Sequence, residues 1–119
     1  MRYILLIYDD EKAMAAKSQA EMAAQLDAWF KYTQALQQSG KMLGGEALKP
    51  TPTATTVRVR EGRTLTTDGP FAETKEQLGG YYMINAEDID EAIEWAAKMP
   101  HTARGGAVEV RPVMEFESR

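Results

Sequence analysis

The chain has 119 residues, of which 44% are hydrophobic and none is cysteine, and its formal net charge is −4 at pH 7. This length fits one domain with a single core, and the absence of cysteine excludes disulfides, thiolate metal sites and cysteine nucleophiles and fits a reducing, cytoplasmic setting. The acidic balance argues against a nucleic-acid partner, because sequence-independent binding needs a basic face.

Residues 2–8 open the chain with a run of apolar and aromatic side chains, which predicts a buried first strand. The run is too short for a signal peptide or a membrane-spanning helix, so we expect no membrane partner. Asp9 and Asp10 follow it and predict a loop.

The most distinct helix is predicted over about residues 18–39. Ser18, with Glu21 three residues later, forms a capping box at its start, and Gly40 marks its end. Its core-facing stripe is predicted at helical spacing, through Met22, Leu26, Phe30 and Thr33, flanked by Trp29 and Leu36.

Three strands are predicted in the middle of the chain. Residues 42–48 are apolar but contain two adjacent glycines, which indicates a weak or bulged strand. Residues 55–60 alternate between polar and apolar side chains, and a tight turn at residues 61–62 returns the chain along residues 64–67 as a hairpin.

The last third of the chain predicts a strand, a helix and a final strand. Residues 78–85 form the strand, and residues 86–98 carry apolar side chains on one helical stripe that ends before Pro100. Residues 108–114 alternate again, and Pro112 favours a sheet edge or a strand end.

This order of elements predicts an α+β domain of the ferredoxin-like arrangement, in which an antiparallel sheet carries two helices on one face. A doubly wound parallel sheet is the alternative, but it needs more helices than the pattern supplies. Residues 3–8 and 78–84 place apolar side chains on both faces of the sheet, whereas two helices cover one face. We therefore expect an obligate homodimer, built as a dimeric α/β barrel, in which a second copy covers the other face.

Residues 68–76 form a turn-rich loop with four charges and one isolated aromatic, and they are the main candidate site. Asp68 is the candidate catalytic residue, as a partly desolvated general base; alternatively, an aspartate before Gly-Pro bonds its own backbone and shapes the turn. Phe71 is interpreted as a peg into the core or a wall of a pocket. Glu73 and Lys75 either orient a ligand or form the exposed outer arc of the loop.

Further candidate ligand-binding residues lie outside that loop. Tyr8 and Asp9 end the first strand, where dimeric barrels of this kind often open their cavity. Glu109 and Arg111 share one face of the last strand, and they either bind a small acid or pair with each other. His101 follows a proline at a helix end, which indicates a surface residue favoured by the helix dipole and, alternatively, a ligand contact.

The motifs of several large functional classes are missing. One histidine, no cysteine and scattered carboxylates predict no metal site, and the chain contains no P-loop, no GxGxxG and no serine elbow, so no cofactor is expected. Arg58, Arg60 and Arg63 form the only local basic cluster, which we interpret as a solvated sheet face.

Residues 68–80, DGPFAETKEQLGG in one-letter code, resemble the signature of the DGPF branch of the YCII-related family. The resemblance extends to residues 1–8, 44–48, 90–96 and 108–113. It implies a dimeric α/β barrel of the ferredoxin-like kind and a regulatory link to extracytoplasmic-function sigma factors, beside whose genes these proteins are often encoded. In the wider family a histidine and an aspartate are suspected of acid–base work, but His101 lies outside the first half of this chain, so that pair is not carried over.

Two functions follow from these observations. The first is a small homodimeric binding or regulatory protein that holds a small polar or aromatic molecule near residues 68–71. The alternative is an enzyme of the isomerase, lyase or oxygenase type, which acts on a small cyclic substrate with Asp68 as acid or base. A purely structural role of Asp68 is the third interpretation.

Overall fold

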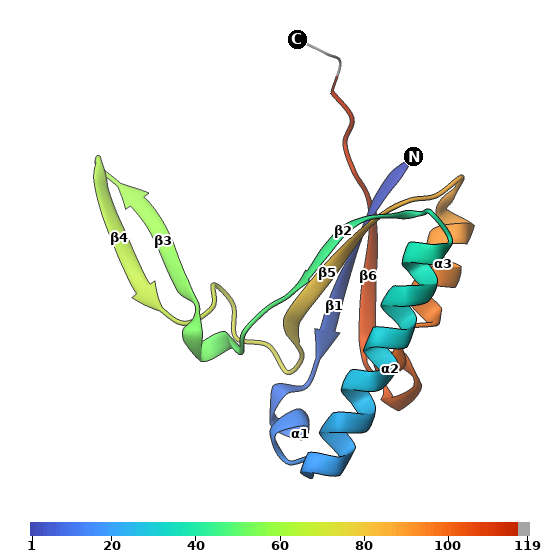
Figure 1. The fold of residues 1–119 in the computed structure, drawn as a ribbon. Coiled ribbons are helices and arrows are strands. Elements are labelled where there is room, and N and C mark those ends of the chain that lie inside the picture. Colours follow the sequence, from blue (N-terminus) through green and yellow to red (C-terminus); the bar gives the residue numbers. More distant parts are fainter. Residues whose placement is uncertain (117–119) are drawn as a thin grey trace.

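The computed structural model describes residues 1–116, and its elements follow the predicted order with one added helix (Figure 1). The strands are β1 (Arg2–Asp9), β2 (Met42–Ala47), β3 (Thr55–Arg60), β4 (Arg63–Asp68), β5 (Gln77–Asn85) and β6 (Ala107–Pro112). The helices are α1 (Glu11–Ala15), α2 (Gln19–Gln38) and α3 (Ile89–Ala97), with short 3-10 turns at η1 (Thr51–Thr53) and η2 (Pro100–Arg104). The predicted α+β class and ferredoxin-like arrangement are confirmed.

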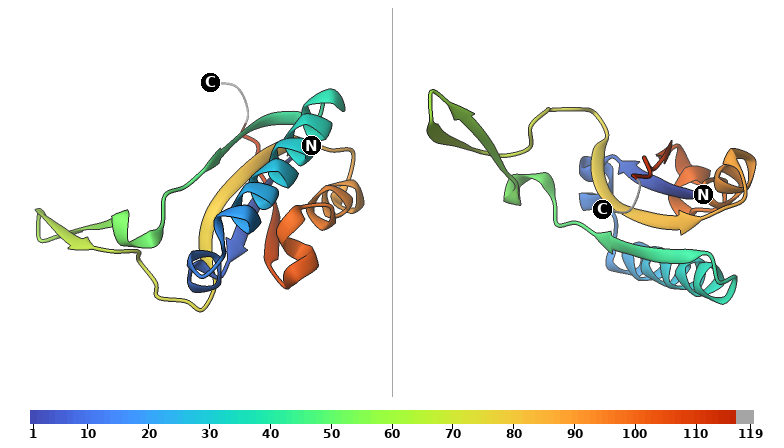
Figure 2. Two further views of the ribbon diagram at one scale, coloured as in Figure 1. Left: turned by 60° about the horizontal axis from the view of Figure 1, so that its bottom comes forward. Right: turned by 90° about the horizontal axis from the view of Figure 1, so that it is seen from above.

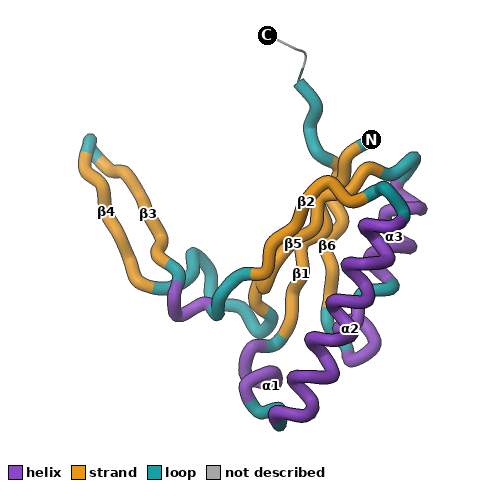
Figure 3. The backbone as a smooth tube through the Cα atoms, viewed as in Figure 1, coloured by secondary structure: helices purple, strands orange, loops and turns teal. Residues whose placement is uncertain are grey.

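The main sheet has the strand order β2-β5-β1-β6, and every neighbouring pair in it is antiparallel. In this register Leu5 of β1 lies between Tyr82 of β5 and Val110 of β6. The pairing of β2 shifts between Met42 and Gly44, which confirms the predicted bulge. Helices α2 and α3 cover one face of the sheet, as the turned views and the tube show (Figures 2 and 3).

The core fills the space between the sheet and these two helices. Its buried apolar residues are Tyr3, Leu5, Tyr32, Leu36, Ile84, Ala86, Ala92 and Met99. Tyr82 lies on the same side, because its ring stacks on Trp29 at 6.5 Å and meets Tyr32 edge-on at 5.5 Å. Tyr81 therefore points to the opposite face, because successive side chains of a strand alternate between its two faces.

No helix within residues 1–116 covers that opposite face of the sheet (Figure 1). Ile4 and Leu6 of β1 lie on it, and they pair with Met83 and Tyr81 of β5, respectively. On the β6 side they are flanked by Arg111 and Glu109, which pair with each other. We call the four apolar and aromatic side chains, Ile4, Leu6, Tyr81 and Met83, the open face.

The predicted core stripe of α2 is wrong for Met22, Leu26 and Phe30, which are 51%, 56% and 65% exposed. The two residues predicted to flank the stripe do face the core, because Leu36 is buried and Trp29 packs against the core cluster, as does the buried Tyr32. The helix carries apolar side chains on two faces, so periodicity alone did not select the face that meets the sheet. The capping box of Ser18 and the stop at Gly40 are confirmed, and no helix in residues 1–116 is long and apolar enough to cross a membrane.

Two local boundaries differ from the prediction because aspartates cap helices. Asp10, predicted in a loop, accepts the backbone N–H groups of Lys12 and Ala13 at 2.9 and 3.2 Å and so begins α1. Asp88 accepts the N–H of Glu91 at 2.9 Å, so α3 begins three residues later than predicted.

The predicted hairpin is confirmed, but it stands apart from the main sheet. Strands β3 and β4 form their own two-stranded sheet, with Glu61 and Gly62 at positive φ in the turn. This hairpin, residues 55–68, projects from the body on the side away from α2 (Figure 1), and we call it the arm. The radius of gyration is 16.5 Å, against about 13.5 Å for a compact chain of this length.

Candidate functional site

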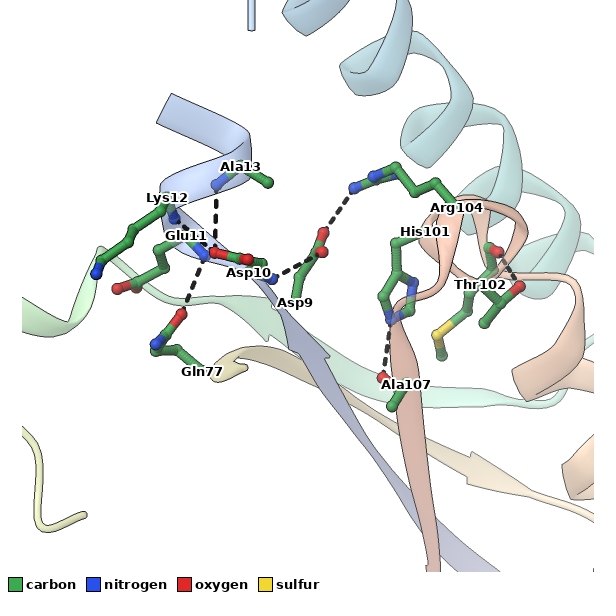
Figure 4. A network of polar contacts seen from close by, with 11 residues as sticks. Asp9, Asp10, Glu11, Lys12, Ala13, Gln77, His101, Thr102, Arg104 and Ala107 are labelled. Carbon is green, nitrogen blue, oxygen red and sulfur yellow. Dashed lines mark hydrogen bonds and ion pairs between the residues drawn. The ribbon is translucent and has the colours of Figure 1, made fainter. Parts of the chain in front are cut away.

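A polar cavity of about 210 Å³ lies where the end of β1, helix α1 and the turn between η2 and β6 meet (Figure 4). It is lined by Asp9, Asp10, Ala13, Met14, Lys17, Glu76, Arg104, Gly105 and Gly106. Segments from both ends of the chain therefore build one site.

The centre of this cavity is the ion pair between Asp9 and Arg104. Asp9 Oδ2 accepts from Arg104 Nη2 at 2.6 Å, and Asp9 Oδ1 accepts the N–H of Asp10 at 2.9 Å. The side chains of Asp9 and Arg104 are 18% and 28% exposed, so solvent or a ligand still reaches both. The pairing of β1 with β5 is irregular between Ile7 and Tyr8, just before this aspartate.

Arg104 is held from more than one side. With its amide oriented to satisfy both groups, Gln25 of α2 accepts from Arg104 Nη1 at 3.0 Å. Gly105 follows with φ +93°, a left-handed conformation that ends η2 and turns the chain into β6. These contacts leave some of the five guanidinium N–H donors free for a ligand.

His101 supports this turn from beneath, and the prediction that it lies on the surface is wrong. The side chain is fully buried and lies 5.3 Å from the Trp29 ring. Its Nε2 donates to the carbonyl of Ala107 at 2.9 Å, and its buried Nδ1 has no hydrogen-bond partner within residues 1–116. A Cβ on Gly106 would lie 2.3 Å from His101 Cδ2, so only glycine fits there.

The charges around the cavity are mixed. Asp9, Asp10 and Glu76 are acidic, whereas Lys17 and Arg104 are basic. Such a lining offers both donors and acceptors, which suits a polar ligand better than a simple anion or cation. No group of three or more His, Cys, Asp or Glu residues within residues 1–116 is arranged to hold a metal ion.

The predicted loop site lies elsewhere. Asp68 is exposed at the end of β4, and neither of the two cavities described in this section is lined by Asp68 or Phe71. Phe71 is 75% exposed and lies under the Arg58 guanidinium at 5.1 Å, so it is no peg into this chain's own core. Glu73 and Lys75 are exposed as well, and a site role for the loop stays a prediction.

Of the remaining predicted site residues, two lie at or beside the polar cavity and two form an ion pair elsewhere. Asp9 reaches the polar cavity, and Tyr8 is half-buried in the adjoining position of β1. Glu109 and Arg111 pair with each other, with Arg111 Nε donating to Glu109 Oε2 at 2.6 Å, as the structural alternative predicted.

Lys17 and Arg104 were not among the predicted site residues, whereas Glu76 is the last residue of the predicted loop, residues 68–76, and the one member of that loop that lines the cavity. A usable signal was present for Arg104, because a basic residue stands directly before two glycines between the predicted last helix and last strand. No comparable local signal marks Lys17.

A second cavity, of about 290 Å³, is mainly apolar and runs beside α2. It is lined by Met14, Met22, Ala23, Gln25, Leu26 and Trp29. Met14 lines both cavities, and Gln25, which lines the second, bonds to Arg104, which lines the first. The two cavities are therefore neighbours.

Comparisons with known proteins agree with this architecture. A family model described as the YCII-related domain matches residues 1–117. An uncharacterized protein of Rhizobium meliloti (strain 1021) is 37% identical over 118 residues, which are 98% of this chain and 95% of that protein. The fold is similar to 5-chloro-2-hydroxyhydroquinone dehydrochlorinase from Burkholderia phenoliruptrix, solved with 2,5-dihydroxybenzoquinone. That comparison has a TM-score of 0.51 and 16% identity, and it covers 98% of this chain and 96% of that one.

Proposed function

The chain belongs to the YCII-related family, and we propose that within this fold it binds a small polar molecule in the cavity around Asp9 and Arg104. The observation that carries the proposal is a charged pair that is mostly withdrawn from solvent yet lines an open cavity. A cavity beside an ion pair does not strengthen the contribution of that pair to stability, whereas charged groups that line a cavity are typical of ligand-binding sites.

The size of the cavity limits the ligand. About 210 Å³ is below the usual 300–1,000 Å³ range of drug-sized sites, so we expect one aromatic ring or a short-chain acid. The free N–H groups of Arg104 and the Lys17 ammonium would bind a ligand oxygen, and the carboxylate of Asp9 would accept from a ligand hydroxyl.

Catalysis at the same site is the second candidate. Asp9 is placed to accept a proton from a bound hydroxyl while Arg104 stabilises the resulting oxyanion, which is a minimal acid–base arrangement. It is favoured by the similar fold of an enzyme whose bound ligand is a single oxygenated ring. Acid–base chemistry at Asp68 and a sigma-factor link remain predictions.

We also propose that the working unit is a homodimer. The open face of Ile4, Leu6, Tyr81 and Met83 lacks a cover within residues 1–116, and apolar sheet faces of this kind are normally covered. A second copy of the chain is the simplest cover.

The binding proposal is tested by adding benzoate, catechol and 2,5-dihydroxybenzoquinone separately to ¹⁵N-labelled protein and following the amide resonances. We expect the largest shifts at Asp10, Gly105 and Gly106 for at least one probe. Arg104→Met, which removes the charged hydrogen bonds, should weaken that binding roughly 10- to 100-fold, whereas the exposed Arg63→Met control should not change it. Shifts confined to other regions, or equal effects of both variants, would contradict the proposal.

The two candidates are separated by Asp9→Asn with the same probes. A catalytic Asp9 predicts that the wild-type protein converts a probe and that the variant still binds it but no longer converts it. A binding role predicts that wild type leaves every probe chemically unchanged, as read by absorbance and mass spectrometry, and that the variant binds more weakly.

A further inference from the structure

The arm forms two paired strands but buries none of their side chains. Eleven of its twelve strand residues are exposed, and Val57 and Val59 are 59% and 67% exposed. A two-stranded hairpin alone in water is marginally stable. The arm therefore needs a surface to pack on, and its own body does not supply one (Figure 1).

The two faces of the arm differ in character. In the register of β3 with β4, Val57 lies opposite Thr66 and Val59 opposite Thr64, so these four β-branched side chains share one face. The other face carries Arg58 opposite Leu65 and Arg60 opposite Arg63. One face is thus suited to packing against a sheet, and the other is cationic.

The cationic face has no carboxylate partner within residues 1–116, and its one recorded contact outside the arm is that of Arg58 with the Phe71 ring. Arg60 and Arg63 stand directly opposite each other, which is unfavourable for like charges. The whole chain has 14 basic and 18 acidic residues. The arm, residues 55–68, holds three of the basic residues and two of the acidic ones. The remainder, with 11 basic and 16 acidic residues, is the more acidic part, so the arm is electrostatically complementary to the body of another copy.

The base of the arm is fixed rather than loose. The carboxylate of Glu11 in α1 accepts the N–H and the hydroxyl of Thr51 in η1 at 2.8 and 2.6 Å. The N–H of Gly69 donates to the carbonyl of Ala54 at 2.7 Å, which closes the hairpin at its root. The direction in which the arm projects is therefore set by the fold.

We propose that each arm lies across the body of a second copy of this chain, with the face of Val57 and Val59 against the partner's open face. This inference rests on the proposed homodimer and adds to it the segment that makes the contact. In a two-fold dimer the contact between the arm of one copy and the open face of the other occurs twice, so both exposed surfaces of both copies are covered. Two strands of six residues reach roughly 20 Å, enough to cross a sheet of four strands spaced about 4.8 Å apart.

The first test is sedimentation equilibrium of wild type, the double variant Val57→Asp with Val59→Asp, and the control Ile93→Asp. These three positions are exposed in the single chain, so their substitution leaves its core intact. Wild type is expected at twice 13.3 kDa. The arm variant should raise the dimer dissociation constant at least about 100-fold, since it introduces four interface aspartates per dimer and two of them at roughly tenfold each already give this factor. The control should match wild type.

The second test places the photoreactive residue benzoylphenylalanine at Val59 in dimers mixed from ¹⁴N and ¹⁵N chains. Mixed-isotope crosslinks from the arm to the strands that carry Leu6 or Met83 are expected. Crosslinks only within one chain, or a wild-type dimer that the arm variant leaves unchanged, would overturn the arm contact while the dimer stands. A wild-type monomer at micromolar concentration would overturn both.

Discussion

The contact between Gly106 and His101 supports a quantitative prediction, because it holds the turn that carries Arg104. In Gly106→Ala the new Cβ would lie 2.3 Å from His101 Cδ2 and 2.9 Å from the His101 carbonyl oxygen. His101 is fully buried beside Trp29, so its ring has no free space to move into. Overpacking of this kind costs about 1–3 kcal/mol, and the lower entropy of the unfolded chain offsets about 0.4–1 kcal/mol. We expect a net loss of about 1–2 kcal/mol in the free energy of unfolding.

Urea denaturation of a double-mutant cycle measures this contact. His101→Ala alone should destabilise the protein, because it leaves a cavity and removes the hydrogen bond to Ala107. In the double variant the total loss should be smaller than the sum of the two single losses by up to about 1–2 kcal/mol. The truncated side chain no longer meets the new methyl group, whereas the His101 carbonyl oxygen still does. Gly79→Ala, with nothing within 4 Å of its Cβ position, is the control, with an expected change within about 0.5 kcal/mol. Strict additivity, or a neutral Gly106→Ala, would refute the reasoning.

Three further predictions concern stability. Tyr32→Phe removes the hydroxyl that donates to the Trp95 carbonyl at 2.8 Å and should cost about 1 kcal/mol in urea titrations; an unchanged midpoint would contradict this. Ser18→Ala removes the helix cap of α2 and should lower stability by about 1 kcal/mol, a loss that Ser18→Asp should largely avoid. The hydrogen bond from Lys41 lowers the folded-state pKa of Glu91, so the pair stabilises the fold above the unfolded value of about 4.3 and loses this effect as the pH falls. The stability difference between wild type and Glu91→Gln should therefore be present at pH 7 and shrink below about pH 4, and a difference that grows on acidification would refute the assignment.

Features with a local cause were predictable from the sequence. The capping box at Ser18 and the turn at Glu61 and Gly62 depend on residues close in the chain, and both were found as predicted. The alternation of side chains along a strand determines that Tyr81 and Tyr82 point to opposite faces, although packing decided that Tyr82 is the one on the core side. The order of elements then left few ways to arrange a sheet with two helices.

The face that α2 buries and the burial of His101 were decided by packing. Leu26 and Phe30 looked as suitable for the core as Tyr32 and Leu36, and only the sheet surface beneath the helix distinguishes them. His101 stands after a helix end in the sequence, but the return of the chain through Gly106 covers it.

The sequence by itself determined every strand, the helices α2 and α3, their order, and an apolar sheet that one layer of helices cannot cover, because each depends on neighbouring residues or on a short repeat. The candidate site was decided by the tertiary structure. Asp9 and Arg104 are 95 positions apart and carry no shared local pattern, and they meet because β6 returns beside β1 in the sheet. The free arm is likewise a tertiary result, because strand pairing within a hairpin is local, whereas the surface on which the hairpin packs is not.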